Sequence, residues 1–221
     1  MNFSLSGEIY MPSIHQAQSW YSVNDPVHGF NHVLRVYHMA EQLARAEGAD
    51  LEIVRAAALL HDAEGSAPND EQSRANHHEA SAFFAHTVLE AEGWSETRIA
   101  AVTHCIRAHR YRTTEAPQSL EAKILFDADK LDVLGAFGAA RTIAYAVQAN
   151  QPIFSEPSER FIFTGEKEPG EPHSSYHEYL FKLRKVKDRL FTDEARRIAE
   201  DRHSFLTLFY EQLIAESKGE R

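Results

Sequence analysis

A chain of 221 residues, 43% of them hydrophobic, is long and apolar enough to build a core of its own, which excludes a disordered protein. Its formal net charge of −10 argues against a general nucleic-acid or anionic-membrane surface, so neither partner is predicted. The single cysteine, Cys105, rules out an internal disulfide. The N-terminus does not resemble a signal peptide and no apolar run is of membrane length, so we expect a soluble cytoplasmic protein.

Apolar residues recur with a helical period along most of the chain, and few stretches alternate as strands do. The pattern predicts a short helix at 13–22 and an amphipathic helix at 30–46. The next helix, Leu51 to Asp62, is apolar all round after Arg55. Because such a helix has no polar face for water, we expect it to be central and buried.

Two helices are predicted in the following stretch. Asn76-x-x-Glu79 resembles a capping box and predicts a helix start there, with the helix running to about residue 92. Ser95 is a favourable cap for the second helix, which continues to about residue 109.

The remaining pattern is also helical. A long helix is predicted over 119–149, although Gly135 and Gly138 inside it would each cost roughly 1 kcal/mol relative to alanine. Residues 150–174 are rich in Pro, Gly and Glu and predict a long surface loop. Two further helices close the chain, at 175–190 and from Thr192 onward. The sequence therefore predicts an all-α protein.

The pair His61-Asp62 carries the most chemical information. It ends a helix whose preceding turns are nearly all apolar, and burying both groups there without partners would cost several kcal/mol. A metal cation would offset that cost, since it neutralises the carboxylate and accepts the imidazole lone pair. Taken alone, such a dipeptide is common and more often forms a structural His-Asp hydrogen bond at a helix end.

Two other elements favour the metal. His32 stands in the first turn of the amphipathic helix, and the motif DADKLD places Asp127, Asp129 and Asp132 in a largely apolar helix. The order H…HD…D therefore falls on three separate predicted helices, and a bundle can bring such residues together in its core.

With this order the sequence resembles the HD-domain metal-dependent phosphohydrolases, and among them a bacterial subgroup of nucleotide pyrophosphohydrolases. The matching segments are HGFNHVLRV, AAALLHDAEG, KILFDADKLDVLGAFGAAR and SSYHEYLFKLRKVKDRLFT…RRIAEDRHSFL, over roughly residues 25–215. The resemblance implies an HD-domain helical bundle with a long loop and C-terminal helices. It further implies a single domain over 1–221, with a core at about 25–150, the loop at 150–174 and helices at 175–216 packed on the core.

The resemblance also implies one divalent metal ion, held by His32, His61, Asp62 and an aspartate of the DADKLD helix. Asp129 matches the family motif and Asp127 is the alternative; two residues apart on a helix they point about 200° apart, so only one can face the ion. A mixed nitrogen and oxygen site suits transition metals rather than calcium. Manganese is the preferred ion, with Mg, Co, Ni, Fe and Zn as alternatives.

Three residues are catalytic candidates: Asp62, Glu64 and Lys130. Glu64 resembles a glutamate that some HD-domain nucleotidases place two residues after the HD pair, where it could orient the attacking water. An exposed loop glutamate is the alternative for this position. Lys130 follows the presumed metal ligand directly and could meet a phosphate.

Five residues are candidates for binding the substrate. His109 lies on the apolar face of its helix and His78 near a predicted helix start; each could contact phosphate, complete a second metal site or be an ordinary structural histidine. Asp132, one turn beyond the presumed metal ligand, could hydrogen-bond a ligand or the substrate. Lys182 and Lys185 are the phosphate candidates in a basic run that could equally be a solvated face.

The resemblance therefore implies a metal-dependent phosphohydrolase, and we expect it to cleave a nucleoside triphosphate to the monophosphate and pyrophosphate. A nucleoside 5′-monophosphate phosphatase and an alarmone hydrolase would use the same metal chemistry and stay open, as does a metal- or nucleotide-binding sensor without turnover. The expected partner is a small phosphorylated molecule, a nucleotide, and the expected assembly is a monomer or a homodimer.

Overall fold

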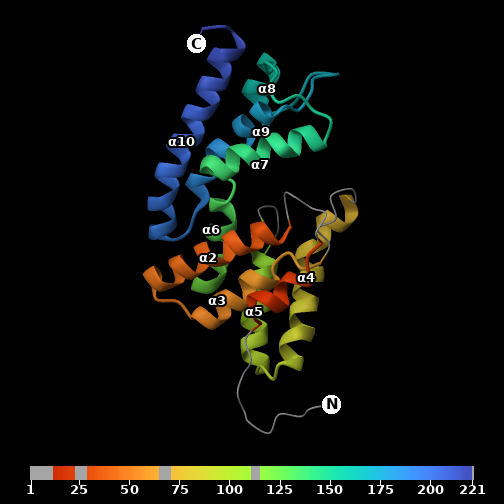
Figure 1. Ribbon diagram of the computed structural model, residues 1–221, viewed down its shortest axis with the longest axis vertical. Helices are drawn as coiled ribbons and strands as arrows, with labels where there is room; N and C mark the ends of the chain where they lie inside the picture. The colour runs from red at the N-terminus through yellow and green to blue at the C-terminus, as the bar shows by residue number, and fades with distance from the viewer. Residues whose placement is uncertain (1–11, 23–28, 65–70, 111–114, 221) are drawn as a thin grey trace. The chain divides into compact units, whose positions relative to one another are not determined.

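The computed structural model describes residues 12–22, 29–64, 71–110 and 115–220, without the side chains of 71–75. The chain divides into two compact units, Met1–Asp129 and Lys130–Arg221, which are described separately below (Figure 1). The described residues contain helices and no strand, so the predicted all-α fold is confirmed. None of these helices is both long and apolar enough to cross a bilayer. The single-domain arrangement stays a prediction.

The first unit is organised around one buried helix. Its described helices are α1 (Ile14–Gln18), α2 (Phe30–Glu47), α3 (Leu51–Leu60), α4 (Glu71–Ala91), α5 (Glu96–Ala108) and most of α6 (Leu120–Leu131). Helix α3 packs against α1, α2, α4 and α5 (Figure 1). Val54 and every residue of the run 56–60 are completely buried. The prediction of a central, buried helix is therefore confirmed.

A tight connection between α2 and α3 determines which ends of these helices meet. Gly48 ends α2 with a φ of +76°, a value that glycine adopts without strain. Asp50 then caps α3 by accepting hydrogen bonds from the amides of Glu52 at 3.0 Å and Ile53 at 3.3 Å. Because so short a connection makes the helices antiparallel neighbours, the start of α2 and the end of α3 lie at the same end of the pair.

Helix α4 begins earlier than predicted. It starts at Glu71, so Asn76 and Glu79 lie inside the helix and the predicted capping box is wrong. The residues upstream, EQSRA, are mostly good helix formers and allow the helix to extend in that direction. His77 and His78 consequently lie about two turns into the helix, not among its first residues.

The long helix predicted over 119–149 is broken, and its two glycines explain the break. Helix α6 ends at Leu131 and α7 (Gly135–Gln148) begins after a short turn. Gly135 has a φ of +68°, in the left-handed region. A Cβ atom on Gly138 would overlap the carbonyl oxygen of Val133, so only glycine allows the chain to fold back this closely. The glycines therefore form the turn and do not weaken a continuous helix.

The second unit contains α7, α8 (Glu159–Thr164), α9 (Ser175–Phe181) and α10 (Asp193–Ser217), with two 3₁₀ turns, η1 (Leu183–Lys185) and η2 (Lys187–Arg189). Helix α7 packs against α9 and α10. The helix predicted over 175–190 is thus a short helix followed by two 3₁₀ turns. Leu183 and Val186 are both buried, and their three-residue spacing suits the period of a 3₁₀ helix.

The segment 150–174 is not the uniform loop that its composition predicts, because α8 forms within it. Ser158 caps α8, and Phe161 is buried. The Glu171 carboxylate ties the segment together, since it accepts hydrogen bonds from the Ser158 amide and hydroxyl, both at 2.7 Å, and from the Glu168 amide at 2.6 Å. His177 on α9 donates a further one at 3.0 Å. The composition of the segment does not reveal these hydrogen bonds, which join residues up to 13 positions apart.

The same hydrogen bonds predict a pH-dependent contribution to stability. Led by the Ser158 amide, they lower the pKa of Glu171 from 4.5 to about 2. A carboxylate with a lowered folded-state pKa contributes stability that is complete above the unfolded pKa and is lost as the pH falls toward the folded one. We expect Glu171→Gln to reduce the free energy of unfolding at pH 7 and to flatten its decline between pH 4.5 and 2, as measured by urea denaturation.

Glu168→Gln is the matched control, because the exposed Glu168 side chain lies outside this hydrogen-bond set and only its backbone amide takes part. It should leave both the stability at pH 7 and its acid dependence unchanged. Equal losses in the two variants would contradict the role assigned to the Glu171 carboxylate.

Candidate metal centre

His61, the residue that ends α3, has its imidazole ring oriented by a backbone carbonyl of the same helix. Its Nδ1 atom lies 2.8 Å from the carbonyl oxygen of Ala58, and because a carbonyl can only accept, Nδ1 carries the proton. The Nε2 atom therefore keeps its lone pair, and it is buried with no hydrogen-bond partner among the described residues. Burial lowers the pKa of His61 to about 4, so the ring is neutral near pH 7, the form that binds metal.

His109, at the end of α5, repeats the arrangement. Its Nδ1 donates to the carbonyl oxygen of Ile106 at 2.5 Å, which leaves Nε2 as the atom that can coordinate an ion or accept a hydrogen bond. A backbone acceptor behind the ring is the usual means by which proteins orient a metal-binding imidazole. Two helices of the first unit thus end in histidines whose Nδ1 atoms are each bonded to a backbone carbonyl of the preceding turn.

Asp62 lies between two pairs of imidazoles. Its Oδ2 atom is 3.6 Å from Nε2 of His61 and 3.9 Å from Nε2 of His32. Its Oδ1 atom is 3.5 Å from Nε2 of both His77 and His109. Burial alone would raise the pKa of Asp62, but the surrounding imidazoles, His61 first, hold it well below its usual value. The group is therefore a carboxylate with one oxygen directed at each pair.

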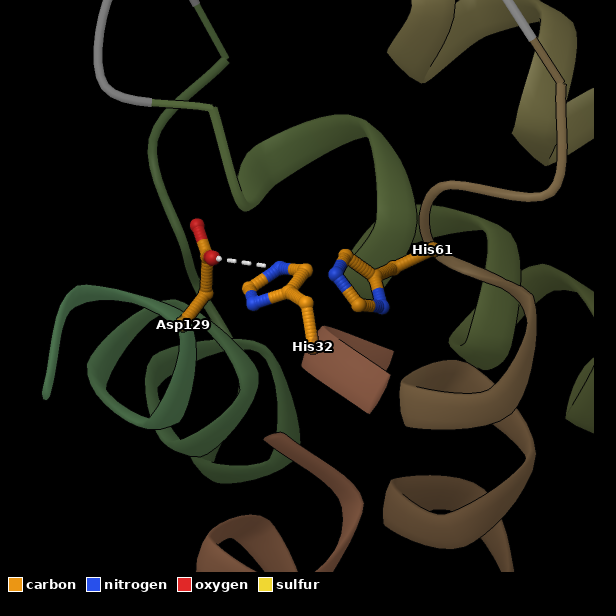
Figure 2. A group of neighbouring side chains, drawn as sticks. All are labelled: His32, His61 and Asp129. Atoms are coloured by element: carbon orange, nitrogen blue, oxygen red, sulfur yellow. Dashed lines mark ion pairs between the residues drawn. The ribbon is translucent and has the colours of Figure 1, made fainter. Parts of the chain in front are cut away.

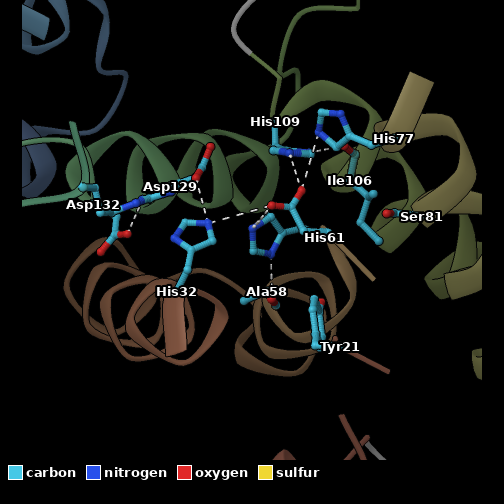
Figure 3. A network of polar contacts seen from close by, with 12 residues as sticks. Tyr21, His32, Ala58, His61, His77, Ser81, Ile106, His109, Asp129 and Asp132 are labelled. Carbon is cyan, nitrogen blue, oxygen red and sulfur yellow. Dashed lines mark hydrogen bonds and ion pairs between the residues drawn. The ribbon is translucent and has the colours of Figure 1, made fainter. Parts of the chain in front are cut away.

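The side chains form two three-residue groups, each with ligand atoms within 4.8 Å of one another. In the first, His32, His61 and Asp129 converge from α2, α3 and α6, and Nε2 of His32 is 3.4 Å from Oδ1 of Asp129 (Figure 2). The second consists of Asp62, His77 and His109, and Figure 3 labels its two histidines. Atoms bound to one ion at about 2.1 Å lie roughly 3 to 4 Å apart, so the cluster can hold a divalent metal.

Two further side chains fix the turn that carries the His61-Asp62 pair. The Tyr21 hydroxyl donates to the carbonyl oxygen of Leu59 at 2.7 Å, and burial first, with the nearby Asp62 charge second, raises the tyrosine pKa well above 10.0. The Ser81 hydroxyl accepts from the Glu64 amide and donates to the Glu64 carbonyl, both at 3.1 Å. The end of α3 is therefore anchored to the segment after α1 by Tyr21, and the HD turn is anchored to α4 by Ser81.

The other predicted catalytic residues have different surroundings. Glu64 is exposed, and no hydrogen bond or ion pair joins its side chain to another described residue. Lys130 is buried on α6 directly after Asp129. Asp127, the alternative fourth ligand, is completely buried and lies outside both three-residue groups.

The remaining substrate candidates lie in the second unit, outside both groups. Asp132 is buried and forms an ion pair with Arg141. Lys182 is paired with Glu178 at 3.1 Å, so its charge is already balanced. Lys185 has no ion pair with a described carboxylate and lines a cavity. Their predicted contacts with substrate stay predictions.

His77 was missed by the sequence argument, which selected its neighbour His78. The helix start predicted at Asn76 hid the helical spacing that points to His77. In a helix that begins at Glu71, every fourth residue from His77 onward lies on the same face, and these residues are Ser81, Ala85 and Leu89. Ser81, Ala85 and Leu89 are completely buried, which puts His77 on the inward face. His78 has a pKa lowered to about 4 by burial but joins neither group.

We expect His77→Ala to lower kcat/KM for hydrolysis about 10- to 100-fold, because one of the two imidazoles facing Oδ1 of Asp62 is lost. His78→Ala, the adjacent matched variant, should stay within about threefold of the parent chain. Steady-state kinetics on both variants, with circular dichroism as a folding check, decides between them. A larger loss of kcat/KM in His78→Ala than in His77→Ala would show that His78, the residue chosen from the sequence, is the functional one.

Comparison with known proteins supports the same region. A family model described as the HD domain matches residues 29–134. The uncharacterized protein YpgQ of Bacillus subtilis (strain 168) is 31% identical over 198 residues, which cover 87% of this chain and 85% of that protein.

Solved structures agree with these matches. The crystal structure of Bacillus subtilis YpgQ in complex with ADP aligns with a TM-score of 0.70 at 28% identity, covering 92% of this chain and 94% of that one. An HD-superfamily hydrolase from Bacillus thuringiensis aligns with a TM-score of 0.66 at 29% identity, over 93% and 96% of the respective chains.

Proposed function

We propose that this chain, which belongs to the HD-domain family and is a metal-dependent phosphohydrolase, cleaves nucleoside triphosphates to the monophosphate and pyrophosphate. The observation that carries the proposal is the Asp62 carboxylate held between two imidazole pairs. The complex of the related YpgQ with ADP supports a nucleotide as the ligand.

The residues at the first group fit a divalent ion. His32, His61, Asp129 and the Oδ2 atom of Asp62 would hold it, since the buried His61 Nε2 has a lone pair and no hydrogen-bond partner among the described residues. When bound, such an ion lowers the pKa of a water ligand and polarises a phosphoryl oxygen. Two imidazoles with two carboxylates suit Mn, Fe, Co, Ni or Zn better than calcium, and manganese is the ion proposed here.

The second group faces the opposite oxygen of Asp62. We assign His109 and His77 to the substrate phosphate, because both Nε2 atoms lie 3.5 Å from Oδ1 of Asp62, the oxygen that is not assigned to the ion. A second ion bound by His77, His109 and Oδ1 of Asp62 is the competing role for this group. Metal analysis of the purified chain separates the two roles: one ion per chain supports phosphate binding, and two ions overturn it.

The turn after the HD pair supplies the proposed positioning of water. Glu64 belongs to that turn, and the buried Ser81 hydroxyl bonds both its amide and its carbonyl. These hydrogen bonds fix the position of the backbone that carries the Glu64 carboxylate. We propose that Glu64 orients the attacking water and that the buried Lys130, next to Asp129, balances phosphate charge.

A nucleotide panel tests the proposal. Nucleoside tri-, di- and monophosphates and guanosine polyphosphates are offered with manganese, magnesium, cobalt or nickel, and phosphate and pyrophosphate are measured separately. Pyrophosphate released from triphosphates is the expected result. Phosphate released from monophosphates would establish a phosphomonoesterase instead. Cleavage of guanosine polyphosphates and of no other nucleotide would establish an alarmone hydrolase. Metal binding without turnover on any substrate would favour the sensor alternative.

A further inference from the structure

A cavity of about 350 Å³ in the second unit lies between the end of α8 and the turn η1. Its size falls in the range of small-molecule sites, roughly 300 to 1,000 Å³. The lining includes the aromatic side chains of Phe163, Tyr176 and Phe181 together with Arg184 and Lys185, and no acidic residue is among the described residues that line it. The cavity therefore offers both a surface for a flat ring and a site for negative charge.

Two of the lining residues are cations, and their surroundings differ from those of the neighbouring cations. Arg184 and Lys185 are exposed, and neither forms an ion pair with a carboxylate in the described part of the chain. Along the same stretch, Lys182 pairs with Glu178 at 3.1 Å and Lys187 with Glu200 at 3.0 Å. In a chain with a net charge of −10, two adjacent unpaired cations beside a cavity favour an anion there.

The aromatic wall is arranged to receive a ring. Phe163 is 84% exposed and Phe181 is 40% exposed, so both present apolar surface to water. The Lys185 ammonium lies 5.8 Å from the centre of the Phe181 ring, which places positive charge beside a stacking face. Gly165 has no side chain, and a Cβ atom there would come within 3.1 Å of the Phe181 ring. The absence of that atom lets the ring stand at the cavity wall.

We propose that this cavity binds a nucleotide, with its base against the aromatic side chains and its phosphates on Arg184 and Lys185. A purely apolar ligand would leave the cations unused, and inorganic phosphate would leave the aromatic surface exposed. All the lining residues belong to the second unit, and none is among the residues proposed to hold the metal. Binding therefore does not require a metal ion, and it is independent of the proposed hydrolysis.

The test measures ADP binding to the full chain carrying Asp62→Asn, in EDTA, by isothermal titration calorimetry. Adding Arg184→Gln and Lys185→Gln is expected to weaken binding at least tenfold. The matched control is Lys187→Gln with Arg197→Gln. It also removes one lysine and one arginine charge, but from side chains that are paired with Glu200 and Glu194. The control should bind within threefold of its parent.

A second variant tests the aromatic half of the site. Phe163→Ala changes a side chain that is 84% exposed, so the fold should be unaffected. It is expected to weaken ADP binding while leaving the much weaker binding of pyrophosphate unchanged. The proposal is overturned if the parent chain binds no ADP in EDTA, if both double variants bind equally well, or if pyrophosphate binds as tightly as ADP. If the parent chain binds ADP in EDTA but the native chain does not hydrolyse triphosphates, the proposed function is contradicted and the nucleotide site is not.

Discussion

Asp62→Asn is expected to remove the bound metal and to lower kcat/KM for triphosphate hydrolysis at least about a thousandfold. The substitution keeps the shape of the side chain but takes away the charge that lies within 4 Å of four imidazole Nε2 atoms. A bound ion contributes several kcal/mol of transition-state stabilisation, and about 4 kcal/mol corresponds to a thousandfold change in rate.

The measurements are metal content by mass spectrometry and steady-state kinetics on the same preparations. Asp193→Asn makes the same chemical change at a side chain that is 95% exposed, and it should alter neither quantity. Hydrolysis that continues in Asp62→Asn after the metal is lost would show that the reaction does not depend on this centre.

Asp129→Asn is expected to weaken metal binding by about a hundredfold or more, because Asp129 supplies the carboxylate oxygen 3.4 Å from Nε2 of His32. Losing an outer partner of a metal ligand typically costs about 10- to 100-fold in affinity, and losing a ligand itself costs at least as much. Competition with a fluorescent chelator gives the affinity directly.

Asp127→Asn provides the matched comparison two residues earlier on the same helix. Asp127 is completely buried but lies outside both groups, so its substitution should lower the thermal midpoint while leaving metal affinity within about tenfold. The reverse pattern, with affinity lost in Asp127→Asn and kept in Asp129→Asn, would make Asp127 the fourth ligand.

The choice between these two aspartates shows where sequence reasoning reaches its limit. Helical geometry states that only one of them can face a given point, and the family motif prefers Asp129. Only the packed helices show that Asp129 approaches His32 and that Asp127 belongs to neither group. The direction in which a helix faces depends on its neighbours, which periodicity describes only on average.

Errors in helix boundaries had consequences of the same kind. The late start predicted for α4 concealed the inward position of His77, and the long helix predicted over 119–149 concealed the turn at Gly135. In the second unit, the hydrogen bonds of Glu171 organise a segment that its composition predicts to be a loop. Local residues favour the first two structures, since helix formers precede Asn76 and glycines form the turn, whereas in the third the hydrogen bonds of Glu171 outweigh the composition of the segment.

By itself the sequence determined the helical class, the central buried helix and the order H…HD…D, because these depend on local periodicity and on the chemistry of a few residue types. The tertiary structure alone decided that Asp62 directs one oxygen at each of two imidazole pairs, and that His77 joins Asp62 where His78 does not. It also decided that Asp132 is paired with Arg141. Those relations are distances between side chains on different helices or turns, and such distances exist only once the helices have packed.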